Sequence, residues 1–158
     1  MHAQLALHDT FVLTRVYPHA PRRVFAAFAD PAKKRRWYAE GDHHAVEAFE
    51  MDFRLGGAER ALYRFKTNTP FPGQTFTNES VFLDIVTDRR IVMGSAMAMG
   101  DNRFSASLVT IELVPDGAGT KLICTHHGSF FEGADGPAMR KQGWERLLDR
   151  LADDLGRN

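Results

Sequence analysis

The sequence has a single cysteine, Cys124, no excess of either charge and no long apolar run. One cysteine cannot form a disulfide within the chain, which is typical of proteins in a reducing cytoplasm. Twenty basic residues balance twenty acidic ones, so the positive charge with which most nucleic-acid-binding proteins contact phosphates is missing. No stretch approaches the roughly 20 apolar residues of a membrane span, and residues 1–10 do not resemble a signal peptide. We therefore expect a cytoplasmic protein that binds no nucleic acid and does not span a membrane.

The composition is that of a globular domain, with 44% hydrophobic and 25% charged residues in a chain of 158. This length is common for one domain and allows a sizeable core. We find no repeat, low-complexity tract or linker that would divide it. The sequence therefore predicts a single domain over residues 1–158.

The first third of the chain predicts one strand and two short helices. Residues 11–17 are rich in β-branched and aromatic types, which favour a strand. Pro21 suits the first turn of a helix, and Asp30 before Pro31 predicts the capped start of a second helix that ends near Trp37. The basic run within this second helix, residues 33–36, is expected to form its solvated face.

From residue 45 onward apolar and polar residues alternate, which is the period of strands with one buried face. After residues 133–137 the period becomes helical, and Trp144 begins an apolar stripe that continues to Leu155. One strand, two helices, six antiparallel strands and a long helix predict an α+β fold, in which a curved sheet of about seven strands surrounds the C-terminal helix. The six later strands are predicted near residues 49–55, 60–66, 75–86, 90–99, 103–114 and 120–129.

Such a sheet has a larger inner face than one helix can cover. The remaining space would form an apolar cavity for a small hydrophobic or aromatic ligand, although a fully packed core is the alternative. We predict that bulky residues and two polar anchors contact this ligand: Trp37, Tyr38, Phe49, Met51, Phe65, Glu79, Met97, His126 and Trp144. Gly143, beside Trp144, is expected to let the helix approach the sheet.

His126, Glu47 and Glu79 fall on the inner face when positions along the strands are counted. His126 points inward together with Cys124 if Lys121 points outward. Glu79 is also counted inward, as are Ser105 and Ser107 on another strand. A Glu79–His126 pair could anchor a ligand or transfer protons. The simpler interpretation of His126 is a core histidine that bonds to a neighbouring group.

No metal or cofactor is predicted, and no residue is assigned a catalytic role. Adjacent residues on a strand point to opposite faces, so neither His43-His44 nor His126-His127 can chelate a metal as a pair. The spacing of cysteine and histidine does not match a zinc site. We also find no phosphate-binding glycine loop and no nucleophile motif.

Four motifs occur in an order that resembles one protein family. They are Ala20-Pro21-Arg22-Arg23-Val24-Phe25 with Asp30-Pro31 and Trp37, then Asp52-Phe53-Arg54-Leu55-Gly56-Gly57, Gly117-Ala118-Gly119-Thr120, and Gly143-Trp144. Together they resemble the START-like (SRPBCC) superfamily and, within it, the AHSA-like group, homologues of the activator of the heat-shock-protein ATPase. The resemblance extends over residues 11–155 and implies a helix-grip fold. It does not imply one activity, because this fold includes lipid carriers, cyclases and co-chaperone domains.

Three functions are therefore open at the level of the sequence. The leading hypothesis is a binding protein for a small hydrophobic ligand. The first alternative is a cyclase-like enzyme that uses His126 or Glu79 to move protons. The second is a protein-interaction or co-chaperone-like module, which an exposed apolar patch would favour. A homodimer is a further partner that we consider.

Overall fold

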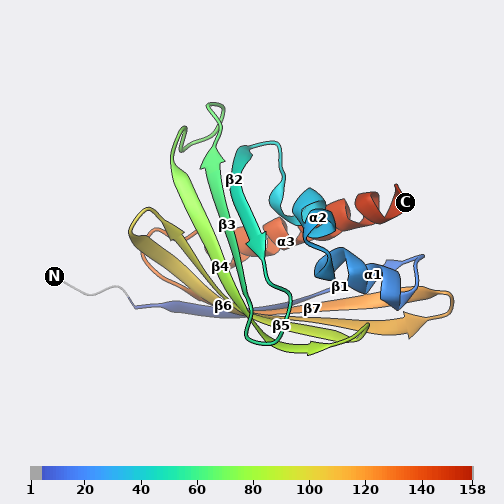
Figure 1. Ribbon diagram of the computed structural model, residues 1–158. Helices are drawn as coiled ribbons and strands as arrows, with labels where there is room; N and C mark the ends of the chain where they lie inside the picture. The colour runs from blue at the N-terminus through green and yellow to red at the C-terminus, as the bar shows by residue number, and fades with distance from the viewer. Residues whose placement is uncertain (1–4, 158) are drawn as a thin grey trace.

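The computed structural model describes residues 5–157, which form one antiparallel sheet with helices on its inner side (Figure 1). The seven strands lie in the order β1-β7-β6-β5-β4-β3-β2. This arrangement is the predicted α+β helix-grip fold. The strands are β1 (Leu7–Tyr17), β2 (His44–Met51), β3 (Ala58–Phe65), β4 (Thr75–Val86), β5 (Arg90–Met99), β6 (Asn102–Asp116) and β7 (Gly119–Phe130), and the helices are α1 (Pro21–Ala29), α2 (Pro31–Lys34), the π-helical turn η1 (Arg35–Ala39) and α3 (Pro137–Gly156).

The short helices begin where the prolines predict. Pro21 occupies the first turn of α1, and the Asp30 carboxylate accepts a hydrogen bond from the backbone N–H of Ala32 at 2.9 Å, which caps α2. α2 continues directly into η1. Trp37 is held there because its indole N–H donates to the carbonyl oxygen of Ala27 at 2.8 Å. This contact fixes η1 against α1 and determines where the next residue, Tyr38, lies.

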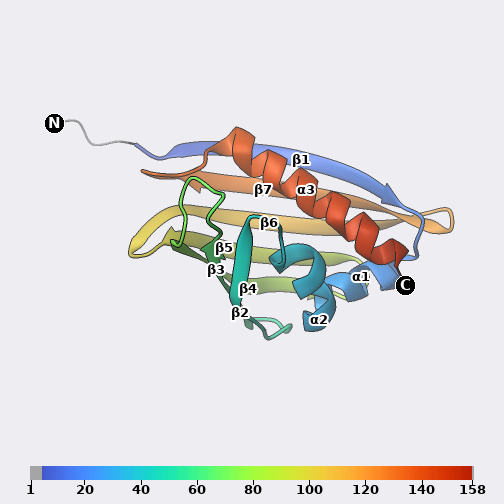
Figure 2. The same ribbon diagram turned by 90° about the horizontal axis from the view of Figure 1, so that it is seen from above.

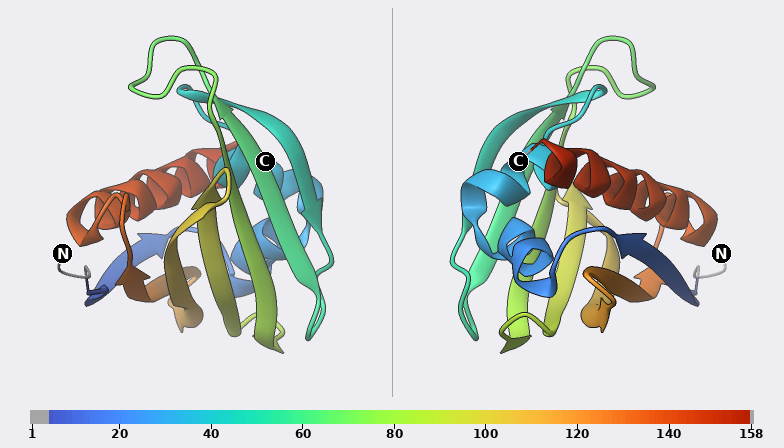
Figure 3. Two further views of the ribbon diagram at one scale, coloured as in Figure 1. Left: turned by 90° about the vertical axis from the view of Figure 1, so that its left-hand side faces the viewer. Right: turned by 90° about the vertical axis from the view of Figure 1, so that its right-hand side faces the viewer.

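The sheet curls into a trough with the helices inside it (Figure 3). α3 crosses diagonally above β1 and β7, and the C-terminal end of α3 lies near α1 (Figure 2). The phenol of Tyr17 donates to the Leu148 carbonyl oxygen at 2.9 Å, which links β1 to the middle of α3. The apolar stripe of α3 is buried as predicted, and its buried apolar residues are Trp144, Leu148, Leu151 and Leu155.

The strand predicted over residues 49–55 is wrong in its second half. β2 ends at Met51, and the chain then turns tightly, with backbone bonds from Arg54 to Asp52 and from Gly57 to Arg54. A Cβ atom at Gly57 would lie only 2.0 Å from the carbonyl oxygen of Asp52, so this turn requires glycine. The alternation beyond Met51 therefore reflects a turn, and Leu55 is exposed. Within the described residues no helix is both long and apolar enough to cross a membrane.

Candidate ligand-binding site

A row of small and polar residues crosses the inner face of five neighbouring strands. Cross-strand pairing joins Gly128 to Ser107, Ser107 to Ser95, Ser95 to Ser80, and Ser80 to Glu59. These five residues are called the polar row below. Ser80 and Ser95 share a hydrogen bond of 2.7 Å between their hydroxyl oxygens. Because glycine and serine are short, the row does not fill the space beneath the helices as leucine or phenylalanine would.

One end of the polar row carries a buried ion pair. Lys34 Nζ lies 2.5 Å from Glu59 Oε1, and the two side chains are only 1% and 2% exposed. The ammonium also lies 4.6 Å from the centre of the Tyr38 ring, a favourable cation–π arrangement. The expectation that residues 33–36 are a solvated face is therefore wrong for Lys34. Its side chain turns inward because Glu59 offers a buried counter-charge.

The other end of the row is held by Arg140 of α3. Its guanidinium donates twice to the Asp135 carboxylate, at 2.9 Å in each case. It also donates to the hydroxyl of Ser105 at 2.8 Å and to that of Ser107 at 3.3 Å. The inward orientation predicted for the two serines is thus confirmed. These bonds position the first turn of α3 over β6.

Tyr38 and Asn78 form a polar bridge between η1 and β4. The Asn78 side-chain N–H donates to the Tyr38 hydroxyl oxygen at 2.9 Å. The carbonyl oxygen Oδ1 of the same amide is buried and has no hydrogen-bond partner in the part of the chain that the structure describes. Burial, and secondarily the nearby Glu59, raises the pKa of Tyr38 well above its usual value, so the phenol keeps its proton at neutral pH. Sequence reasoning found Tyr38 but missed Asn78.

His126 points inward from β7, as predicted from the orientation of Lys121. Its ring is 1% exposed and stacks on Phe11 with the ring centres 4.6 Å apart. Burial and then the positive charge of Arg140 lower the pKa of His126 to about 4, so the imidazole is neutral at pH 7. Its Nδ1 atom is buried, and residues 5–157 supply no hydrogen-bond partner for it.

Glu79 does not face His126, and this prediction is wrong. Its side chain is exposed on the outer face, where its carboxylate accepts a bond from Arg60 at 3.3 Å. β4 and β7 are separated by two strands. The error arose because β4 carries apolar residues on both faces, with Val81 exposed and Phe82 buried, so alternation alone does not identify the inner one. The cyclase hypothesis therefore loses its proposed proton-transfer pair. The inward position predicted for Glu47 is also wrong, because the register shifts between Val46 and Ala48 and leaves Glu47 exposed, where it accepts a bond from Arg64.

The other predicted contact residues occupy two kinds of position. Trp37 lies in the main core, 1% exposed with its N–H satisfied, and Met51 packs against that core. Trp144 is buried, with its ring centre 6.1 Å from that of Tyr38. The remaining predicted residues are half-buried on the inner face of β2, β3 and β5: Phe49, Phe65 and Met97.

Met97 and Phe65 lie near the polar bridge. Met97 pairs across the sheet with Asn78 on one side and Ser105 on the other. Phe65 stacks on Phe76, with ring centres 4.7 Å apart, and Phe76 precedes Asn78 by two residues on the same face of β4. Tyr38 thus connects Trp144 to Asn78, and Met97 lies beside Asn78 on the neighbouring strand.

Gly143 does not bring α3 close to the sheet as predicted. The residue is half-buried, yet a Cβ atom built on it would have no neighbour within 4 Å among the described residues. Side chains therefore leave unfilled space beside α3 at this point.

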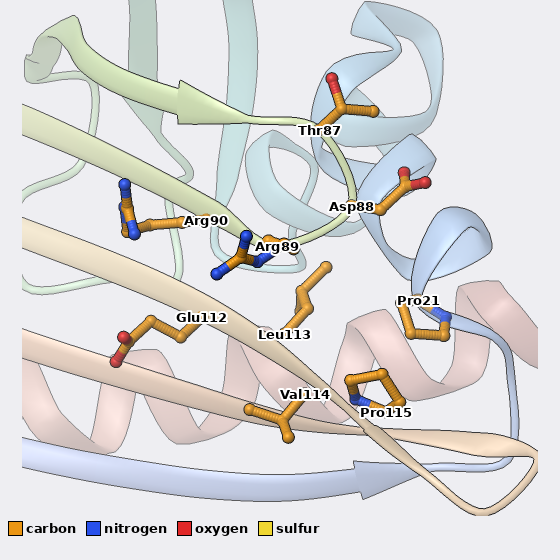
Figure 4. A pocket seen from close by; sticks show the side chains of 9 residues that line it. All are labelled: Pro21, Thr87, Asp88, Arg89, Arg90, Glu112, Leu113, Val114 and Pro115. Atoms are coloured by element: carbon orange, nitrogen blue, oxygen red, sulfur yellow. The ribbon is translucent and has the colours of Figure 1, made fainter.

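Two hollows on the molecule lie elsewhere. One of about 600 Å³ is lined by Pro21 and by residues at the ends of β4–β6, including Arg89 and Leu113 (Figure 4). The other, of about 400 Å³, lies beside the β3–β4 hairpin near Gly73. An enclosed cavity beneath α3 remains a prediction. In residues 5–157 no group of three or more histidine, cysteine, aspartate or glutamate side chains is placed to hold a metal.

The outer face of the sheet carries exposed apolar side chains. Val81 and Leu108 pair with Gly94 from opposite sides, and Leu83 lies next to them. Their exposed fractions are 43%, 39% and 53% for Val81, Leu108 and Leu83. This is the feature that would favour an interaction module. The homodimer considered from the sequence stays a prediction.

Comparison with known proteins identifies relatives along nearly the whole chain. The family described as activator of Hsp90 ATPase homolog 1-like protein matches residues 18–156. A protein of Rhizobium loti is 43% identical, with 96% of this chain and 99% of that chain covered and a TM-score of 0.83. A putative uncharacterized protein of Rhizobium leguminosarum is 33% identical, with 97% of each chain covered and a TM-score of 0.89. The AHSA1 protein of Silicibacter pomeroyi, 23% identical over 94% of this chain and 98% of that chain, shares the fold with a TM-score of 0.73.

The comparison with curated proteins gave no match. The match to the family extends from Pro18 to Gly156 and includes every motif on which the resemblance rests. The two Rhizobium proteins are similar to this chain in both sequence and fold. The chain therefore belongs to the family of activator of Hsp90 ATPase homolog 1-like proteins, as its motifs predict.

Proposed function

We propose that this chain binds a small ligand with an apolar, aromatic body on the inner face of the sheet, between α3 and strands β3–β5. The observation that carries the proposal is the buried carbonyl oxygen of Asn78, which has no partner in residues 5–157. A buried acceptor without a hydrogen bond costs about 1–3 kcal/mol. A bound molecule that donates a hydrogen bond to this oxygen would remove the cost.

The surroundings of Asn78 suit an apolar body. Met97 lies beside it on β5, and Phe76 lies on the same face of β4. These side chains are half-buried, so they have surface that the protein itself does not cover. Methionine has a flexible and polarizable side chain that adapts to the shape of a ligand. The ring of Tyr38 and the buried Trp144 form the opposite side of this region.

The unfilled space beside Gly143 supports an opening for the ligand on the side of α3 that faces η1. Gly143 and Asp154 are eleven residues apart, which is about three helical turns, so both lie on one side of the helix. Asp154 accepts two hydrogen bonds from Arg36 of η1. Gly143 therefore faces the side on which η1 lies, nearer the start of α3, where a side chain would meet no other atom within 4 Å.

The test is to fill this space. We expect Gly143→Leu to weaken the binding of 1-naphthol and 1-methylnaphthalene at least about tenfold in titration calorimetry, because the added side chain occupies the opening. The fold should gain stability, since glycine inside a helix is about 0.5–1 kcal/mol less favourable than a good helix former.

Gly156→Leu is the matched control. It also removes a helical glycine with no atom within 4 Å of its Cβ, but it lies about 20 Å further along α3. It should leave the affinity for both compounds unchanged. If neither compound binds the natural protein, or if Gly143→Leu binds them as tightly as the natural protein does, the proposed site is wrong.

A further inference from the structure

We infer that Tyr38 and Asn78 are the residues that determine ligand specificity, and that they select a neutral ligand carrying a hydroxyl group on its aromatic body. The inference rests on the proposed function, because it concerns the same site. It follows from which hydrogen-bonding atoms the pair leaves free and from how the charges around the site are paired.

Besides the second N–H of the Asn78 amide, the bond between the two side chains leaves an acceptor on Asn78 and a donor on Tyr38. The Asn78 amide uses an N–H to reach the Tyr38 oxygen, so its carbonyl oxygen Oδ1 remains. The Tyr38 oxygen accepts that bond, and its own proton has no acceptor among the described residues. Burial keeps this proton in place by raising the pKa of Tyr38. An acceptor and a donor therefore lie next to each other.

A hydroxyl group is the ligand group that satisfies both atoms at once, because it can accept one hydrogen bond and donate another. It would accept from the Tyr38 phenol and donate to Asn78 Oδ1. A ketone or an ether only accepts and would leave Oδ1 unpaired. A hydrocarbon would leave both atoms unpaired in a poorly solvated place, which is unfavourable.

The buried charges indicate that the ligand is neutral. Among residues 5–157 the buried charged side chains are Lys34, Glu59, Arg140 and Asp154. Each already has an oppositely charged partner: Lys34 and Glu59 bind each other, Arg140 binds Asp135, and Asp154 binds Arg36. A carboxylate or an ammonium entering this region would compete with a formed pair. Burying an unpaired charge is far more costly than burying a hydroxyl group.

The experiment compares ligands of one shape that differ in a single group. Binding of 1-naphthol, 1-methylnaphthalene and 1-naphthoate is measured by titration calorimetry at pH 7. We expect 1-naphthol to bind about 10- to 100-fold more tightly than 1-methylnaphthalene, because two buried polar atoms gain partners. The charged 1-naphthoate should bind most weakly.

Variants of the pair identify the residues responsible. Asn78→Leu and Tyr38→Phe should each reduce the preference for 1-naphthol to about threefold or less, while the affinity for 1-methylnaphthalene stays within a factor of about three of its natural value. Glu79→Gln is the control, since Glu79 is adjacent to Asn78 in β4 but lies on the outer face, and it should keep the full preference. Thermal unfolding of each variant checks that it is folded.

The outcomes separate this inference from the proposed function. Three results would overturn the assigned ligand class even if Gly143→Leu still blocked binding. They are equal affinity for 1-naphthol and 1-methylnaphthalene, tightest binding of 1-naphthoate, and a preference for 1-naphthol that persists in both variants. Binding that is insensitive to Gly143→Leu would instead overturn the site itself. A preference lost in Asn78→Leu and Tyr38→Phe, and kept in Glu79→Gln, supports the inference.

Discussion

The two halves of the interior differ in how fully side chains fill them. Leu148 and Leu151, in the middle of α3, belong to the same buried apolar cluster as Ile111 and Leu122, and none of the four is measurably exposed. We call this the packed half. The polar row, its two ion pairs and Asn78 form a second region, which Arg140 in the first turn of α3 contacts through Ser105 and Ser107, and several of these side chains are half-buried. We call this the polar half.

The difference separates stability from recognition. Apolar burial contributes about 25 cal/mol per Å², so the packed half supplies most of the free energy of folding. Buried ion pairs contribute little net stability, because desolvation offsets their attraction. The polar half therefore contributes little for its size, and its polar atoms are better explained by a molecule that binds there. Substitutions in the two halves should consequently differ in which quantity they change.

The largest effect is expected from Lys34→Met, which breaks the ion pair in the polar half. Glu59 would be left charged and 2% exposed without its partner. Removing one member of a buried pair typically costs about 3–5 kcal/mol. We expect a loss of this size in urea unfolding at pH 7.

The double variant Lys34→Met with Glu59→Leu tests the reason for that loss. Replacing both charges with apolar groups of similar size is often neutral, so most of the stability should return. If the double variant is as unstable as the single one, the pair itself stabilises the fold, and our distinction between the halves fails.

Trp144→Ala should cost about 3 kcal/mol, the lower end of the range for replacing a buried tryptophan. The residue lies at the boundary of the two halves, buried beside Tyr38 but next to the unfilled space at Gly143. Leu148→Ala, in the packed half, provides the comparison. An unchanged denaturant midpoint for Trp144→Ala would mean that its ring contributes no packing.

His126 should make stability depend on pH. Its pKa is lowered from 6.5 to about 4 in the folded state. As the pH falls, the unfolded chain takes up a proton near pH 6.5 while the folded chain resists it until about pH 4. Stability is therefore lost across this window and is unaffected by His126 above it. By pH 4.5 the loss should reach about 2.5 kcal/mol, since one pKa unit corresponds to about 1.4 kcal/mol.

The measurement compares unfolding free energies at pH 7 and pH 4.5. His126→Gln should lose clearly less stability than the natural protein over this interval. His127→Gln, whose side chain is exposed on the other face of β7, should behave like the natural protein. Parallel curves for all three proteins would show that His126 titrates normally.

The fold could be predicted because its signals are local. Proline positions, the alternation of β7 and the stripe of α3 each depend on residues within one element. For this reason the starts of α1 and α2 and the inward orientation of Cys124 and His126 agree with the structure. The order of the elements followed from these local patterns as well, and the family motifs occur in the same order.

The site could be predicted only in part because it depends on register between strands. The polar row exists because Ser80, Ser95 and Ser107 pair with one another across three strands. Irregularities between Phe82 and Asp84 in β4, and beyond Met97 in β5, change the count of residues along these hairpins. No pattern within a single strand reveals such shifts. Serines at inward positions of consecutive strands were the available signal.

The smallest change in stability is expected for a double variant at Tyr38 and Asn78, which should also have the greatest effect on ligand binding. The double variant Tyr38→Phe with Asn78→Leu removes the polar bridge together with the unpartnered Oδ1 atom. Replacing both partners of a buried hydrogen bond by apolar groups of similar shape is nearly neutral or stabilising. We therefore expect the ligand-free protein to change by no more than about 1 kcal/mol, towards greater stability.

The same variant should lose the thermal stabilisation that 1-naphthol gives the natural protein, because a ligand stabilises the folded state only as far as it binds. Melting curves with and without 1-naphthol measure both quantities in one experiment. Ser80→Ala with Ser95→Ala is the comparison, since it removes another hydrogen-bonded pair of the polar half but no unpartnered atom. Stability that falls by several kcal/mol in the Tyr38 and Asn78 variant would mean that the bridge belongs to the framework of the fold. In that case the polar half would be structural, and its open acceptor would have no role in recognition.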